Sequence, residues 1–195
     1  GMAAGQSLDE GTHGTIDSNI AIGKDSFLGG NLNTGATAIV GNIAIGTDAL
    51  NSTGTNAQTG TIAIGHQSLT ALTSGVDNVA IGYQSLVSLT NGARNVAIGY
   101  GAMLDTVGAG DNVGIGYQAL KDGSTSEQDV AVGAYALGAN SAAALTGNAN
   151  TAVGYKSLYI AQGAAHTNTA VGQNTLQALT TGFRNVVMGG AAGYS

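Results

Sequence analysis

A five-residue motif that recurs along almost the whole chain limits the possible folds more than any other feature of the sequence. The copy Asn78–Gly82 reads NVAIG, and every other copy differs from it at two positions at most. In the middle of the chain the motif returns every 17 residues, from Gly65 to Gly133. Self-similarity at a fixed, short period is the signature of a solenoid, in which each repeat forms one coil and stacks on the next. The glycines that close the copies are Gly23, Gly46, Gly65, Gly82, Gly99, Gly116, Gly133, Gly154, Gly172 and Gly189.

A second block follows the closing glycines at a fixed distance. Four residues after each glycine except Gly189 stands a large apolar residue, usually Leu, and the residue before it is small, as in Ser85–Leu86. The unit therefore reads N-V-A-I-G-Y-Q-(S/A)-L, followed by a variable stretch. Insertions lengthen the first two units and the unit that contains residues 138–149.

The motif has the length and the alternation of one short β-strand. Val79 and Ile81 fall on one face, and Asn78, Ala80 and Gly82 fall on the other. Equivalent strands that stack about 4.8 Å apart form a parallel sheet. The sequence therefore predicts an all-β chain, a parallel β-solenoid or β-roll of about ten 17-residue repeats. We expect the Val and Ile columns to form its core and the Leu column to lie over that core.

The small residues in the middle of the strands predict a contact with another backbone. A solvent-facing strand position normally accepts larger side chains, so restriction to Ala or Gly favours a close approach. We interpret this column as a subunit interface of a homotrimer, with the chains intertwined or side by side. In the alternative interpretation Asn and Gly only form turns, and the Asn column can also form an amide ladder. The interface column is Ala44, Ala63, Ala80, Ala97, Gly114, Ala131, Ala152 and Ala170.

The outer block of each repeat is compatible with two conformations. Leu86 and Leu89 lie three residues apart and Gly92 follows, which is typical of a short helical turn that ends at a glycine. Helices, however, need 8–10 Å between their axes, whereas a second short strand stacks at the spacing of the sheet. We therefore expect short strands, with short helical turns as the alternative.

Composition excludes several classes of protein. Of 195 residues, 33 are Gly, none is Pro or Cys, and only 8% are charged. Without Cys there is neither a disulfide scaffold nor a Cys-based zinc site, and we expect no metal and no cofactor. A net charge of −6 argues against a nucleic-acid partner. No apolar stretch is long enough for a membrane-spanning helix, so we expect no membrane insertion.

An aromatic stripe is the main candidate for ligand contact. Tyr83, Tyr100 and Tyr117 follow successive closing glycines, Tyr155 continues the column, and His66 occupies it one coil earlier. Stacked aromatic residues commonly only stabilise a solenoid, but they also form platforms for sugar rings. The inserted segments Gly29–Gly41, Asn51–Gly60 and Gly138–Ala149 are further binding candidates, because insertions leave a solenoid through its surface.

Charged residues give little evidence of catalysis. Asp77, Arg94 and Asp111 are 17 residues apart, which predicts a ladder of charges at one corner rather than a reactive site. Asp105 and Asp122 share nearly the same corner, but turn capping accounts for such residues. The chain also lacks a nucleophile elbow, a phosphate-binding loop and an HExxH motif. We therefore expect no enzyme activity.

The repeat N-x-A-(I/V)-G-Y-(Q/K)-(S/A)-L, followed by T-x-G, resembles the repeat region of bacteriophage tail-fibre proteins. It is more distantly similar to the head repeats of trimeric autotransporter adhesins of the YadA type, whose units are usually shorter. The resemblance covers residues 18–193. It implies an elongated homotrimer in the virion that attaches to a glycan or a protein of the host surface.

The repeats divide the chain into three parts. We expect an N-terminal flank at residues 1–17, in which Gly1 before Met2 is typical of a tag remnant, ten repeats at 18–193 and a truncated end at 194–195. The predicted function is a non-catalytic, structural and adhesive segment of a tail fibre. The alternatives are a bacterial trimeric adhesin head on the cell surface, and a solenoid enzyme or lectin-like binder of surface polysaccharide.

Overall fold

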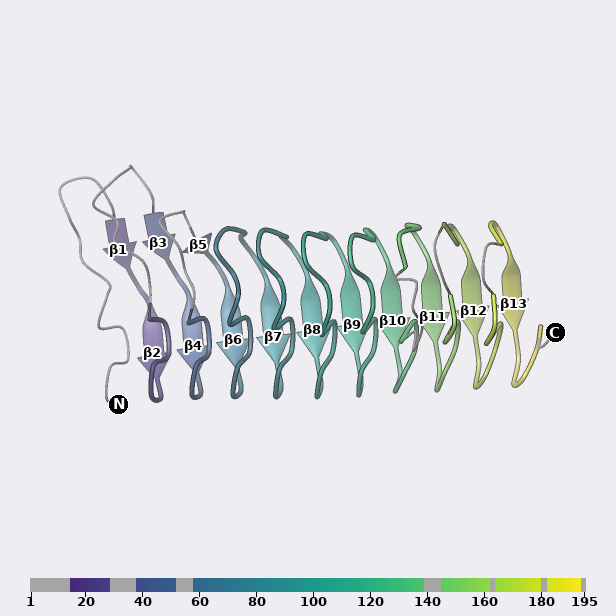
Figure 1. Cartoon of the computed structure of the whole chain (residues 1–195), viewed down its shortest axis with the longest axis horizontal. Coiled ribbons are helices and arrows are strands. Elements are labelled where there is room, and N and C mark those ends of the chain that lie inside the picture. Colours follow the sequence, from purple (N-terminus) through teal and green to yellow (C-terminus); the bar gives the residue numbers. More distant parts are fainter. Residues whose placement is uncertain are drawn as a thin grey trace.

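The computed structural model shows a stack of coils and describes residues 15–28, 38–51, 58–138, 145–161, 164–179 and 182–193. Within these residues every regular element is a β-strand. One strand from each coil joins a parallel, ten-stranded sheet that runs along the length of the molecule (Figure 1). The predicted parallel β-solenoid is therefore confirmed. The strands are β2 (Ile20–Ile22), β4 (Ile43–Ile45), β6 (Ile62–Ile64), β7 (Val79–Ile81), β8 (Val96–Ile98), β9 (Val113–Ile115), β10 (Val130–Val132), β11 (Thr151–Val153), β12 (Thr169–Val171) and β13 (Val186–Met188).

A smaller parallel sheet lies beside the first coils. It has the order β1–β3–β5 and consists of β1 (Thr15–Asp17), β3 (Ala38–Val40) and β5 (Gln58–Thr59). β3 and β5 come from the insertions of the first two repeats, so part of each insertion extends the stack. β1, which precedes the first copy of the motif, pairs with β3 in register.

The faces of the strands are opposite to those predicted. In β7, Ala80 is fully buried within the single chain, whereas Val79 and Ile81 on the other face are only half-buried. Strict pairing repeats this arrangement from coil to coil, as between β7 and β8. The predicted subunit interface at the Ala column is therefore wrong: Ala44, Ala63, Ala80, Ala97, Gly114, Ala131, Ala152 and Ala170 line the interior of the coil.

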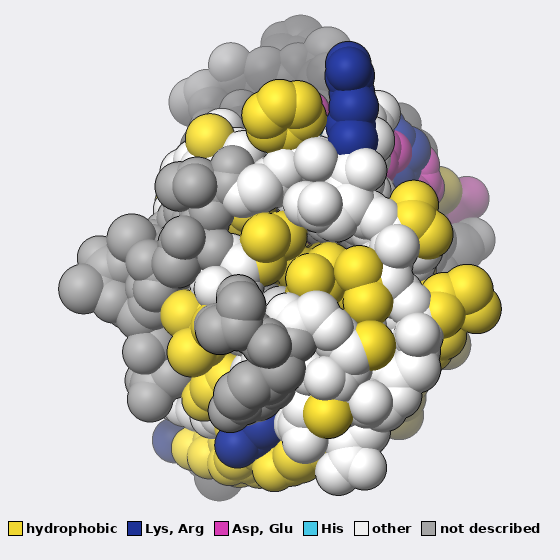
Figure 2. All heavy atoms as spheres, turned by 90° about the vertical axis from the view of Figure 1, so that its right-hand side faces the viewer, with side chains coloured by type: hydrophobic (Ala, Val, Ile, Leu, Met, Phe, Trp, Pro, Cys, Tyr) yellow, Lys and Arg dark blue, Asp and Glu magenta, His cyan; other side chains and the backbone are white. Residues whose placement is uncertain are grey.

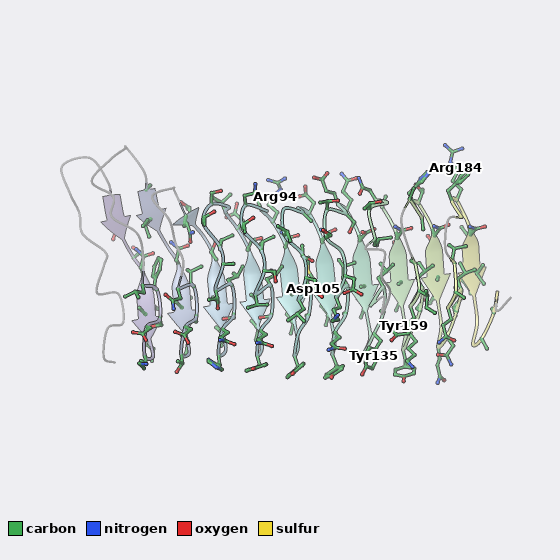
Figure 3. The ribbon with its side chains drawn as sticks, viewed as in Figure 1. Arg94, Asp105, Tyr135, Tyr159 and Arg184 are labelled. Carbon is green, nitrogen blue, oxygen red and sulfur yellow. The ribbon has the colours of Figure 1, made fainter. Side chains whose placement is uncertain are left out.

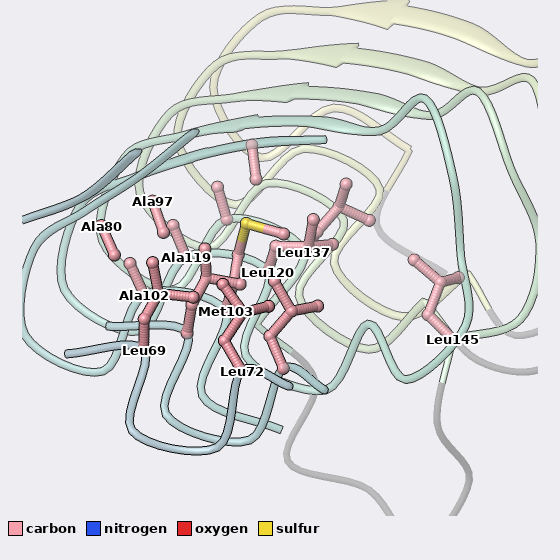
Figure 4. Close-up of a cluster of buried hydrophobic side chains, with 14 of the residues drawn as sticks. Leu69, Leu72, Ala80, Ala97, Ala102, Met103, Ala119, Leu120, Leu137 and Leu145 are labelled. Atoms are coloured by element: carbon pink, nitrogen blue, oxygen red, sulfur yellow. The ribbon is translucent and has the colours of Figure 1, made fainter. Parts of the chain in front are cut away.

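The Leu column explains why small residues face inward. Leu86 and its equivalents are buried and cluster with the Ala column. Figure 4 shows three of these equivalents, Leu69, Met103 and Leu120, beside Ala80 and Ala97. The coil is narrow, so a large side chain from the turn needs a small one opposite it on the strand. The core is thus made of Leu against Ala rather than of Val and Ile.

The Asn column forms an amide ladder, as the sequence allows. Asn95 donates its backbone N–H and its side-chain amide to Asn78 Oδ1, at 3.0 and 3.1 Å. The same amide donates to the carbonyl of Ala109 at 2.9 Å. Both side chains are fully buried, and a buried polar group costs free energy unless it is hydrogen-bonded. The ladder therefore holds the residue that precedes each strand in register with its equivalent in the next coil.

The outer block is neither strand nor helix. It is a turn in which Gln84 and Leu86 adopt φ angles of 53° and 50°, a left-handed conformation that Leu rarely takes. Hydrogen bonds to neighbouring coils hold the turn: Leu86 N donates to Ala102 O at 3.0 Å, and Gln84 N donates to His66 O at 3.0 Å. The expectation of short strands is wrong because the turn obtains its stacking bonds without extended backbone.

Candidate functional site

The aromatic stripe lies where each strand of the large sheet ends and the turn begins. Tyr83, Tyr100 and Tyr117 each follow a closing glycine, so the stacking of coils places their rings one above another. Successive ring centroids are 5.2 Å apart and the ring planes meet at 22° and 12°. We call these three residues the tyrosine ladder. About half of each side chain remains exposed, so the ladder is a continuous aromatic edge on the surface.

His66 extends the tyrosine ladder by one coil, as the sequence predicts. Its ring centroid lies 5.5 Å from that of Tyr83, at an interplanar angle of 53°. His66 Nδ1 donates to the carbonyl oxygen of Thr47 at 3.0 Å, which orients the ring. His66 is therefore part of the stripe and contacts no carboxylate among the described residues.

The ladder changes direction after Tyr117. In the next coil Ala134 follows the closing glycine and the aromatic residue, Tyr135, comes one position later. Tyr135 meets Tyr117 at 69° and meets Tyr155 and Tyr159 at 84° in both cases, with centroid distances of 5.1, 6.1 and 5.9 Å. The rings are thus edge to face rather than stacked, and they no longer cover one another as the ladder rings do.

A pocket of about 370 Å³ opens at this change of direction. Tyr135 and Tyr159 lie toward the edge where the strands end, far from Arg94 on the opposite edge of the coils (Figure 3). We call the pocket the Tyr–Lys pocket, and its volume is at the lower end of the range of small-molecule sites, about 300–1,000 Å³. Its lining is Gln118, Lys121, Tyr135, Gly138, Tyr155, Lys156 and Tyr159.

Lys156 lies at the centre of the aromatic residues. Its ammonium nitrogen is 5.1 Å from the ring centroid of Tyr159, 5.4 Å from that of Tyr155 and 5.7 Å from that of Tyr135. A cation within about 6 Å of a ring face is attracted by the negative potential of that face. Three such contacts hold the ammonium in place. Within the part of the chain that the structure describes, no carboxylate lies within ion-pair distance of Lys156.

The second lysine of the pocket is neutralised. Lys121 Nζ lies 3.1 Å from Asp105 Oδ2 and 3.0 Å from Asp122 Oδ1. Burial disfavours the charge of Lys121, but its hydrogen bonds to the two carboxylates outweigh this effect and raise the pKa of the ammonium. Burial also raises the pKa of the Asp122 carboxyl, against the opposing effect of Lys121. The two acids that share a corner in the sequence therefore meet through a lysine.

The other charged corner is a surface ion pair. Arg94 donates to both carboxylate oxygens of Asp111, at 2.6 and 2.8 Å. This hydrogen-bonded pairing raises the pKa of Arg94 and lowers that of Asp111. Asp77 lies on the same side but makes no ion pair with Arg94. The predicted three-membered ladder of charges therefore forms only in part. Both groups of the pair are exposed, and such pairs contribute little to stability.

Other predicted binding candidates lie mainly beyond the described residues. Residues 29–37, 52–57 and 139–144 of the three insertions are among those the structure leaves out. A second pocket, of about 360 Å³, borders the third insertion and is lined in part by Asn148 and His166. The ring of His166 stacks on Phe183 in the following coil at 5.3 Å, which accounts for its position.

Sequence reasoning found the tyrosine ladder and Tyr155 but missed Tyr135, Tyr159, Lys121 and Lys156. The available signal was a local concentration of basic residues and tyrosines. Two of the five basic residues and three of the seven Tyr lie between residues 121 and 159. This cluster begins where Tyr leaves its usual position in the repeat.

The described part of the chain has no assembled metal site. There, no three His, Asp or Glu side chains gather closely enough to hold a metal ion. The same residues contain no helix with the length and hydropathy needed to cross a membrane. Comparisons of the chain with protein-family models, with curated proteins and with solved structures give no match, so the functional conclusion rests on the repeat and on the geometry described above.

Proposed function

We propose that this chain is a non-catalytic, structural and adhesive segment of a bacteriophage tail fibre, assembled as a homotrimer that attaches to a host surface. The observation that carries the proposal is the outer face of the ten-stranded sheet. On each strand the first and third residues point away from the core, and all of them are Val, Ile, Met or Thr. We call this surface the Val/Ile face.

The Val/Ile face is unusual for the surface of a monomer. It contains no charged residue over ten strands, and nine gaps of about 4.8 Å give it a length of roughly 43 Å. Soluble monomers rarely expose long, continuous apolar patches, and such patches commonly mark interfaces. Figure 2 looks onto the C-terminal end of the stack and shows hydrophobic side chains reaching the surface; within the stack, Ile115 of this face is 36% exposed.

The shape of the face favours three chains. Each face has two columns of side chains, one from the first and one from the third residue of every strand. Around a three-fold axis, each chain has two neighbours, so each column packs against one of them. The absence of charge and the aliphatic composition are typical of obligate interfaces. A trimer of this kind is a stiff rod, as a fibre or an adhesin stalk requires.

A double substitution on the central strand β8 tests the assembly. Val96→Glu together with Ile98→Glu places two carboxylates on the Val/Ile face, where they remain hydrated in an isolated chain but would be desolvated in an interface. We expect sedimentation velocity to show a three-chain species for the unaltered protein at micromolar concentration and a single-chain species for the variant. Far-UV circular dichroism of the variant should retain the β-sheet signal.

Tyr100→Glu is the matched control, because it adds a carboxylate to the same coil outside the Val/Ile face. It should leave the three-chain species intact. A stable single chain in the unaltered protein contradicts the assembly, and a two-chain species replaces the trimer by a face-to-face dimer. The attachment function is tested separately by binding of the labelled trimer to candidate host cells.

A further inference from the structure

The Tyr–Lys pocket combines features that the rest of the described surface does not share. In the tyrosine ladder each ring face is covered by the next ring, at centroid distances of 5.2 Å. At Tyr135, Tyr155 and Tyr159 the rings meet at 84° and border a pocket of about 370 Å³. If these tyrosines only stabilised the stack, continued parallel stacking would serve that purpose. The change of direction instead exposes aromatic surface to a concave site.

Lys156 gives the pocket a local partner for an anionic group. Lys121 pairs with both Asp105 and Asp122, so this group carries a formal net charge of −1 and offers no free ammonium. Lys156 makes no ion pair among the described residues and is held by three ring faces. One ammonium is therefore available to an incoming carboxylate.

The remaining lining defines the rest of the ligand. Aromatic rings pack against apolar surfaces, and one face of a pyranose ring presents such a surface through its C–H groups. The Gln118 amide and the tyrosine hydroxyls donate and accept hydrogen bonds, as the hydroxyls of a sugar require. Burial, and after it the neighbouring phenol groups, raise the pKa of Tyr135, and its hydroxyl is a neutral donor and acceptor near neutral pH. A ring with an apolar face, several hydroxyls and one carboxylate satisfies all these groups.

We propose that the Tyr–Lys pocket binds a carboxylated sugar residue, of the hexuronic acid type, within a surface polysaccharide. The tyrosine rings stack on the sugar ring, and Lys156 forms a charge-assisted hydrogen bond to its carboxylate. This inference rests on the proposed adhesive function and names the chemistry of the surface that it contacts. The net charge of −6 repels polyanions, so non-specific attraction does not account for such binding.

The test is titration calorimetry with trigalacturonate and with the same trisaccharide after reduction of its carboxyl groups. We expect trigalacturonate to bind. The reduced sugar should bind at least about tenfold more weakly, because it loses one charge-assisted hydrogen bond. Lys156→Gln should produce a similar loss for trigalacturonate and no change for the reduced sugar. Tyr159→Ala should weaken both sugars. Acetate alone should not bind at about 1 mM.

Two controls isolate the pocket. Lys24→Gln removes an exposed lysine from a distant coil, and Tyr83→Ala removes a ring from the tyrosine ladder; neither should change the affinity for trigalacturonate. Equal binding of the two sugars, equal losses in Lys24→Gln and Lys156→Gln, or no binding at about 1 mM would each overturn the inference. Sedimentation of the same samples separates the two proposals. Failure to bind sugar in an intact three-chain species rejects the pocket alone, whereas loss of the three-chain species rejects the assembly.

Discussion

Gly99→Ala is expected to prevent the chain from folding or to lower its free energy of unfolding by more than about 4 kcal/mol. Gly99 has a φ of 132°, a conformation that residues with a Cβ rarely adopt. A methyl group there would lie 2.5 Å from the carbonyl oxygen of Gly116 in the next coil. That oxygen belongs to the backbone of a stacked strand end, so relief requires the two coils to separate.

The measurement is urea unfolding followed by far-UV circular dichroism. Gly101→Ala is the matched control, because it is the same chemical change two residues away. Its φ is 57°, close to the values of Gln84 and Gln118 at the equivalent position, and an added Cβ would meet only side-chain atoms, Gln118 Cγ at 3.5 Å and Leu104 Cδ1 at 3.9 Å. We expect it to cost about 1 kcal/mol. Similar unfolding curves for the two variants would show that the stacking distance at the closing glycines is not limiting.

Asp129→Asn is expected to raise the free energy of unfolding at pH 7.5 by up to about 3 kcal/mol. Asp129 stands in the Asn column and is fully buried. Its Oδ1 accepts from the backbone N–H and the side-chain amide of Asn150, at 2.7 and 3.1 Å, but Oδ2 has no partner. Burial raises the pKa of this carboxyl from 3.8 to about 6, against the opposing effect of the hydrogen bonds from Asn150.

The sign of the pH dependence follows from that shift. A carboxyl whose pKa is higher in the folded than in the unfolded state favours folding when protonated. Its contribution is complete below about pH 4, is lost as the pH rises through about 6, and amounts to about 2 pKa units or 3 kcal/mol. Asn has no such titration and restores an amide donor to the ladder. The variant should therefore gain most at pH 7.5 and little at pH 4.

Urea unfolding at pH 4 and pH 7.5 measures this difference. Asp77→Asn serves as the control, because its side chain lies on an exposed corner, and it should change the unfolding free energy far less at both values. A gain of the same size at pH 4 and pH 7.5 for Asp129→Asn would attribute the effect to the amide alone. No gain at pH 7.5 would show that the buried carboxylate is already compensated.

The candidate site was only partly accessible from the sequence. A fixed repeat places Tyr83, Tyr100 and Tyr117 in one column, and their stacking follows from the spacing of the coils. Tyr135 lies outside that column by one residue, so its ring turns and its neighbours become Tyr155 and Tyr159. Lys156 joins them because its turn positions its side chain over the rings. Contacts of this kind depend on three-dimensional turns that a repeat pattern does not encode.

The sequence by itself determined the solenoid, its period, the positions of the strands of the ten-stranded sheet and the glycines that end them, because a short motif repeated at a fixed period stacks in register. It did not determine which face of the strand is inside. Alternation creates two faces, Val with Ile and Asn with Ala, and both are able to form a column. Only the tertiary structure decided between them, because the large side chains of the left-handed turns fill the narrow coil and leave room for Ala alone. The same packing leaves the Val/Ile face on the outside of the chain.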